Sequence, residues 1–198
     1  MAIPLTRSIA GTEVPAAGLW AFDAGHTEAA FAGTHLMINR VRGRFDRVTG
    51  WLDVAENPER SKGELVIDTR SLTSGFRDRD EHLKSGEWLD VDNHPRILYR
   101  STGLEFVAGR VWRLAGDLTV KDITHPVEAR ATFGGGSVDP WGHEKIGFAV
   151  AAEMDRELWD LRWNLPLDAG GWVVSRRVWL TVNVEAVRAD LAASGEAG

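Results

Sequence analysis

The chain has 198 residues, 43% hydrophobic and 26% charged, and its net charge of −6 argues against nucleic acid as a partner. It contains no cysteine, which excludes disulfides, zinc–thiolate sites and thiol catalysis. Nine Trp and seven Phe stand against a single Tyr, a set of large apolar side chains with few hydroxyl groups that suits an apolar interior.

The first segment, residues 1–17, has little periodicity and contains three Pro or Gly residues, which predicts an arm leading into the fold. Residues 1–10 carry one positive charge and no apolar run as long as the core of a signal peptide. No later segment reaches transmembrane length. The sequence therefore predicts a cytoplasmic protein without a transmembrane segment.

From Gly18 to about Arg188 apolar and polar residues alternate repeatedly, a pattern typical of strands with one buried face. Turn chemistry at 106–110 and 134–137 separates some of these segments. Since the segments have short connections, they predict an all-β fold, an elongated antiparallel β-barrel whose closure removes exposed strand edges. The segments, about eight in number, are 29–35, 41–54, 63–69, 96–106, 114–120, 127–133, 146–150 and 178–186.

One segment interrupts this rhythm. Residues 77–85 are rich in polar residues that favour a helix, and Gly86 follows at a position that ends one, so they predict a short surface helix. Residues 189–198 are small and polar and predict a flexible tail. The domain organisation expected from these patterns is an arm (1–17), a barrel domain (18–188) and a tail (189–198).

Motifs of the common enzyme classes are missing. The chain has no Gly-rich phosphate loop, no dinucleotide fingerprint after a strand and no common hydrolase signature, so no cofactor is predicted. The six histidines lack the short spacing of a helical metal pair, and no metal site is predicted. If a metal site formed, its candidate ligands would be His26, His35, His82 and His94. The six are His26, His35, His82, His94, His125 and His143.

His35 shares strand parity with Phe31 and Gly33, so the three side-chain positions lie on one face. If Phe31 faces inward, His35 faces the lumen. There it can either donate a hydrogen bond to the polar end of a ligand or satisfy a buried carbonyl, and the structural role is favoured.

A series of ordered motifs spans about residues 19–187. The longest is segment 78–90, Asp-Arg-Asp-Glu-His-Leu-Lys-Ser-Gly-Glu-Trp-Leu-Asp, which is followed by His94-Pro95-Arg96-Ile97. The others are Asp23-Ala24-Gly25-His26-Thr27 with Phe31 and His35, Val41-Arg42-Gly43-Arg44-Phe45, Gly116-Asp117-Leu118-Thr119-Val120 with Thr124-His125-Pro126-Val127, and Arg156 with Trp163-Asn164. Together these motifs resemble the YceI-like, polyisoprenoid-binding family.

The resemblance implies an extended, lipocalin-like barrel whose apolar tunnel holds a long lipid or isoprenoid, often as a homodimer and without recognised catalysis. The chain departs from the family pattern at Trp88-Leu89, where two Phe are usual, and at Lys121-Asp122, where the hairpin turn usually has Gly. A third departure, at 157–160, affects a loop expected at the mouth. Asp can adopt a left-handed turn, so the hairpin is expected to form.

The strand pattern is compatible with the same function. A strand of ten to twelve residues is about 33 to 40 Å long, which suits an extended guest. Small residues such as Ala29 and Gly33 on the Phe31 face would leave space for it. Parity and size place seven side chains on the lining, with His35 and Arg156 near a polar head. The seven are Phe31, Phe45, Leu98, Leu118, Phe148, Trp163 and Leu180.

The leading hypothesis is therefore a protein that binds, transports or sequesters a long-chain isoprenoid or other lipid without catalysis. One alternative is an enzyme or metal-binding protein that uses lumenal His and carboxylates such as Asp23 and Asp80. Another is a filled barrel that acts only as an interaction module. A continuous apolar cavity would distinguish the first from the last.

Overall fold

The computed structural model describes residues 4–168 and 170–189. Its elements are mostly strands, with one α-helix and three 3-10 helices among the described residues. The strands are β1 Thr6–Ile9, β2 Thr12–Pro15, β3 Gly18–Phe22, β4 Glu28–His35, β5 Asn39–Phe45, β6 Val48–Val54, β7 Lys62–Asp68, β8 Leu72–Thr73, β9 Arg96–Ala108, β10 Val111–Val120, β11 Ile123–Val138, β12 Glu144–Asp155 and β13 Val174–Arg188. The helices are η1 Pro58–Arg60, η2 Thr69–Ser71, α1 Arg77–Lys84 and η3 Arg156–Trp159.

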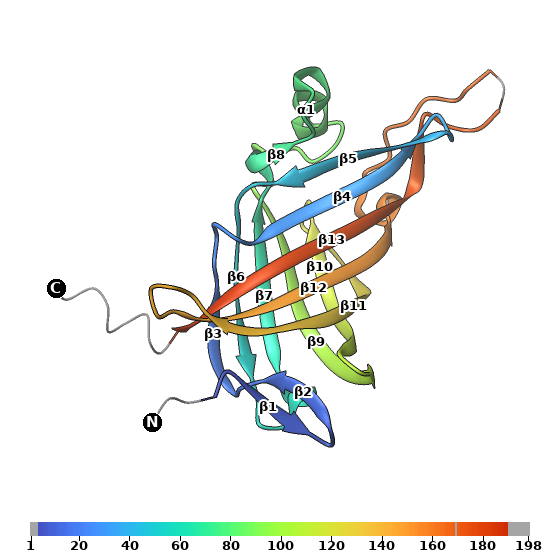
Figure 1. The fold of residues 1–198 in the computed structure, drawn as a ribbon. Helices are drawn as coiled ribbons and strands as arrows, with labels where there is room; N and C mark the ends of the chain where they lie inside the picture. The colour runs from blue at the N-terminus through green and yellow to red at the C-terminus, as the bar shows by residue number, and fades with distance from the viewer. Residues whose placement is uncertain (1–3, 169, 190–198) are drawn as a thin grey trace.

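Eight strands close into an antiparallel barrel, in the order β3-β6-β7-β9-β10-β11-β12-β13 (Figure 1). The ring closes because β13 pairs with β12 on one side and with β3 on the other. The N-terminal part of β13 pairs instead with β4, and the sheet continues from β4 to β5 and β8. The predicted all-β barrel of about eight strands is therefore confirmed.

Helix α1 confirms the predicted surface helix. Asp80 in its first turn accepts hydrogen bonds from the backbone N–H (2.7 Å) and the hydroxyl of Ser74, which fix the chain entering the helix. The segment that follows buries Trp88, Leu89 and Val91 against the barrel. Within the described residues, no helix has the length and apolar character needed to cross a bilayer.

Some local predictions need correction. The Gly-rich segment at 134–137 is not a turn between strands but lies within β11, where the pairing with β12 shifts register between Phe133 and Gly135. Gly135 has a φ of +119°, which disfavours residues with a side chain, so the glycines form a bulge in a continuous strand. The predicted strand 41–54 is two strands, β5 and β6. The arm contains a hairpin, β1–β2, that buries Val14. Residues 190–198 of the predicted tail lie outside the described residues.

Two buried tryptophans lie in separate clusters of the barrel core. Trp20 is fully buried among residues of β11, β12 and β13, and its Nε1 donates to Ala16 O at 3.2 Å. Trp159 is buried in the cluster that also contains Trp88, and its Nε1 donates to Leu118 O at 3.0 Å.

Candidate functional site

The inner faces of the strands enclose a cavity of about 250 Å³. Every strand of the closed ring contributes to its wall, and most of the lining side chains are apolar. A single water needs only about 10–15 Å³ of such space, and large apolar cavities stay dry. The cavity is therefore far larger than a packing defect, and its chemistry suits an apolar guest.

The alternation of the strands explains the free space. Val127, Ala129 and Ala131 of β11 point inward, as do Val150 and Ala152 of β12. Ala129 pairs with Ala152 in register, and Ala131 with Val150, so small side chains lie side by side on the inner surface. Because successive residues of a strand face opposite sides, the outward positions between them do not affect this space.

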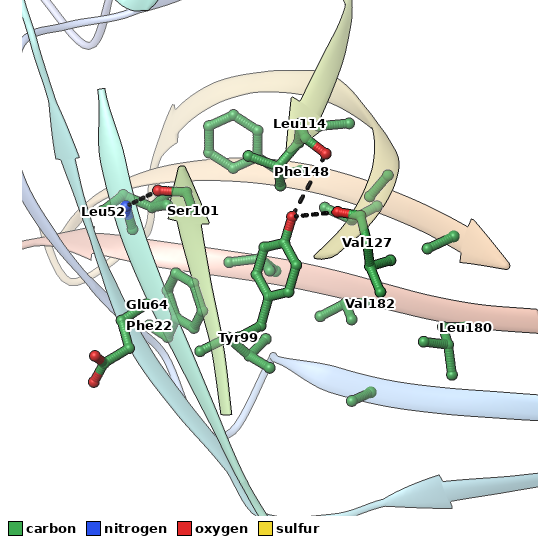
Figure 2. A pocket seen from close by; sticks show the side chains of 18 of the residues that line it. Phe22, Leu52, Glu64, Tyr99, Ser101, Leu114, Val127, Phe148, Leu180 and Val182 are labelled. Carbon is green, nitrogen blue, oxygen red and sulfur yellow. Dashed lines mark hydrogen bonds between the residues drawn. The ribbon is translucent and has the colours of Figure 1, made fainter. Parts of the chain in front are cut away.

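Tyr99 is a rare polar side chain in the wall. Figure 2 shows its hydroxyl between the carbonyl oxygens of Leu114 (3.5 Å) and Val127 (3.4 Å), both at the long end of hydrogen-bond range. Its ring lies against Gly116, where a Cβ would be 2.3 Å from Tyr99 Cζ. Burial, with a smaller effect of Asp117, raises the pKa of Tyr99 well above its ordinary value. The hydroxyl is therefore neutral, and its proton is directed at these two backbone carbonyl oxygens.

The polar part of the wall lies where β7 begins. Lys62, at the start of β7, is exposed and contributes to the lining. Next to it, the hydroxyl of Ser101 accepts a hydrogen bond from Gly63 N at 2.8 Å (Figure 2). The carboxylate of Glu64 accepts one from Arg100 Nε at 2.7 Å. Lys62 and Glu64 alternate with the inward Leu65, and Figure 2 shows the carboxylate of Glu64 pointing away from the other side chains drawn, so the charged groups of these two residues lie outside the cavity.

Five residues that the sequence predicts as lining are brought together around the cavity. The aromatic rings of two of them, Phe31 and Phe45, are 5.7 Å apart, and Phe31 covers Gly43 of the paired strand. The five are Phe31, Phe45, Leu118, Phe148 and Leu180.

Two other predicted residues lie outside the wall for reasons of strand geometry. Leu98 faces away from the cavity, because Ile97 and Tyr99 take the inward positions of β9. His35 does not face the lumen as expected. It is exposed at the end of β4, where residues 35–40 all face solvent and the hairpin projects beyond the buried interior.

The last two predicted residues also lie outside the cavity wall, and both pack against Trp88. Trp163 packs its ring against His82 (4.5 Å) and Trp88 (5.8 Å). Arg156 is 1% exposed, and it donates from Nε to Ser175 O at 3.0 Å and from Nη1 to Leu161 O. Its guanidinium lies 5.0 Å from the ring of Trp88. Burial lowers the pKa of Arg156, while Glu157 and Asp155 oppose this shift.

Sequence reasoning missed Tyr99, Lys62 and Ser101 as lining residues. Tyr99 has the parity of Ile97, but Leu98 between them is also apolar, so alternation did not show which of the two faces is inward. The position of Lys62 depends on where β7 begins and diverges from β9, and no local pattern shows that.

The titratable residues proposed for catalysis lie elsewhere. In the described part of the chain no histidine lines the cavity. Asp80 is held by Ser74, whereas Asp23 belongs to a separate cluster with His26 and Glu185. The ammonium of Lys145 lies within this cluster, 2.9 Å from Asp23 and 2.6 Å from Glu185, and supplies its counter-charge.

We expect this cluster to stabilise the fold in a pH-dependent way. Partial burial would raise the pKa of Asp23, but hydrogen bonds from Lys145, His26 and Gly25 outweigh it and lower the pKa to about 2. A lowered carboxyl pKa stabilises the folded state above its unfolded value of 3.8, and the contribution is lost as the pH falls towards 2. Asp23→Asn should lower the free energy of unfolding by about 1–2 kcal/mol at pH 7, after discounting for solvent screening.

Denaturant titrations at several pH values check this. The difference between Asp23→Asn and wild type should shrink between pH 4 and pH 2. Asp53→Asn is the control, because Asp53 is exposed and forms no ion pair with any described residue. If the difference in the free energy of unfolding stayed constant across this pH range, the ionised carboxylate of Asp23 would not be the source of the stabilisation.

Taken together, a closed antiparallel barrel with an apolar cavity defines a lipocalin-like barrel. A family model for the YceI-like domain matches residues 20–186, and the chain belongs to this family. A UPF0312 protein of Vibrio parahaemolyticus is 30% identical over 162 residues, which cover 81% of this chain and 82% of the relative.

Solved structures show the same fold. BcnA of Burkholderia cenocepacia matches with a TM-score of 0.72 and 14% identity, over 83% of this chain and 98% of BcnA. A polyisoprenoid-binding domain from Saccharophagus degradans matches with a TM-score of 0.65 and 13% identity, over 85% of this chain and 98% of that domain. At these identities the likeness concerns the fold.

Proposed function

We propose that this protein binds a long-chain isoprenoid or a similar lipid inside the barrel, for transport or sequestration and without catalysis. The observation that carries the proposal is the continuous apolar cavity of about 250 Å³. Membership of the YceI-like family and the fold shared with a polyisoprenoid-binding domain support it. The homodimer and the cytoplasmic location expected from the sequence remain predictions.

The energetics favour a chain over a compact polar ligand. Each methylene moved from water into the cavity contributes up to about 0.8 kcal/mol, so roughly ten contribute about 8 kcal/mol before the costs of immobilisation. Phe31, Phe45, Leu118, Phe148 and Leu180 would contact the chain.

Extraction and titration test the proposal. Protein purified from its own cells should release an apolar compound into organic solvent, identified by mass spectrometry. Delipidated protein in detergent solution should bind prenols with an affinity that rises with chain length until the cavity is filled, because each added carbon buries more surface. If no apolar compound is extracted and no prenol binds, the proposal fails.

A further inference from the structure

Two loops outside the barrel present an apolar surface that the cavity does not explain. The first is the β4–β5 turn, residues 36–38, and the second is the loop between η3 and β13; both project at the same corner of the molecule (Figure 1). Their exposed large apolar residues form what we call the apolar tip. Its members, with exposed fractions, are Leu36 (38%), Met37 (60%), Ile38 (84%), Leu165 (53%) and Trp172 (52%).

The two loops form one continuous surface. Leu36 N donates to Val173 O at 2.8 Å, and a Cβ on Gly171 would lie 3.5 Å from Met37 Cγ. Within the second loop, Val173 N donates to Leu165 O at 3.0 Å, which holds Leu165 beside the residues that directly precede β13. The apolar side chains are therefore presented together by hydrogen-bonded backbone.

The backbone of the first loop is strained for the residues it carries. Leu36 and Met37 have φ values of +51° and +60°, the left-handed conformation of a type I′ turn. Asn and Gly are preferred there, because a Cβ in this conformation meets the following carbonyl oxygen. The β10–β11 turn has the same backbone at Lys121 and Asp122, but with polar side chains. Strained residues persist mainly where function requires them, and here the strain holds two large apolar side chains in solvent.

The charges around the apolar tip that have no ion-pair partner among the described residues are two arginines and one aspartate, in a protein of net charge −6. Segments 29–45 and 161–177 contain six arginines and a single acidic residue, Asp168. Four of these arginines pair with acids outside the two segments, namely Arg44 with Asp46, Arg162 with Asp160, Arg176 with Asp155 and Arg177 with Glu153. Arg40 and Arg42 have no acidic partner among the described residues, and both are exposed on the outer face of β5.

We propose that the apolar tip docks this protein on an anionic lipid bilayer. Exposed aliphatic side chains enter the interfacial region, Trp172 suits the boundary between headgroups and acyl chains, and Arg40 and Arg42 face anionic headgroups. A second copy of the chain fits less well, because a two-fold interface would set these arginines against each other. This inference goes beyond the proposed function, which concerns the cavity alone.

A turn variant separates docking from folding. Leu36→Asn/Met37→Gly places residues that prefer the left-handed backbone at the turn, so the fold should be at least as stable as wild type. Lys121→Asn/Asp122→Gly makes the same substitutions in the polar turn and is the matched control. Ile38→Asp is a third variant, because Ile38 is 84% exposed and its replacement leaves the core intact.

The measurement is flotation of the full chain with phosphatidylcholine vesicles, with or without about 30% phosphatidylglycerol. Wild type and the Lys121/Asp122 variant should float with anionic vesicles, and raising salt from about 50 mM to about 500 mM should weaken this binding. The Leu36/Met37 and Ile38 variants should bind at least about tenfold more weakly. Docking is refuted if wild type does not bind anionic vesicles or if the Leu36/Met37 variant binds as well as wild type.

Other outcomes distinguish the alternatives. Equal binding to neutral vesicles would overturn the assignment to an anionic surface. If the Leu36/Met37 variant converts a dimer to a monomer in light scattering while wild type ignores vesicles, the apolar tip is a self-association surface and docking fails. Prenol loading in vesicle-free detergent solution tests the cavity separately, so docking can fail while the proposed function stands, and the reverse.

Discussion

Ala152→Phe is expected to weaken the binding of a long-chain lipid by roughly 100-fold. Ala152 lines the cavity from β12, opposite Ala129, and a phenyl ring there would displace about four methylenes of a guest, or roughly 3 kcal/mol. The fold should tolerate the change, because the ring enters space that is otherwise free of side chains. Prenol titration of delipidated protein gives the affinity, and thermal unfolding gives the stability.

The adjacent residue provides a matched control. Ala151 is exposed on the outer face of the same strand, so Ala151→Phe adds the same side chain without entering the cavity and should leave prenol affinity within about twofold of wild type. If both variants bind prenol as tightly as wild type, the guest does not occupy this part of the barrel. Equal loss in both would point to a general effect on the sheet.

The barrel could be predicted from the sequence because the alternation of apolar and polar residues along each strand is a local pattern. Alternation records which face of each strand is buried, and it correctly places Leu118, Phe148 and Leu180 on the inner face. The same rule fails for Leu98, because three apolar residues in succession at 97–99 leave the parity of β9 undetermined. It also fails for His35, because parity specifies a face but not whether the strand still encloses an interior at that point.

Other features depend on tertiary pairing. The edge of the cavity at Lys62 and the β1–β2 hairpin result from how distant segments meet. The type I′ turn at Leu36 and Met37 could not be predicted, because turn rules favour Asn and Gly at those positions. The proposed docking role accounts for this departure from the local rule, because docking requires large apolar side chains at an exposed turn.

Arg156→Met is expected to lower the free energy of unfolding by about 3–4 kcal/mol, without a selective effect on ligands with a polar head. The guanidinium holds Leu161 O and Ser175 O, at the two ends of the loop that carries Leu165 and Trp172, and it is buried against Trp88. Met replaces the volume but leaves both carbonyls without this donor. Denaturant titration measures the stability.

Arg162, in the same loop, provides the control for Arg156→Met. Arg162 has a side chain that is 73% exposed and pairs only with Asp160 among the described residues, so Arg162→Met should change stability by less than about 0.5 kcal/mol. The sequence-based hypothesis placed Arg156 near a polar head, which predicts weaker binding of a prenyl phosphate than of the matching prenol in the variant. Both ligands should be titrated under conditions where Arg156→Met stays folded. If Arg156 contacts the ligand head, the variant loses more affinity for the prenyl phosphate than for the prenol. If the role of Arg156 is structural, the two affinities change equally.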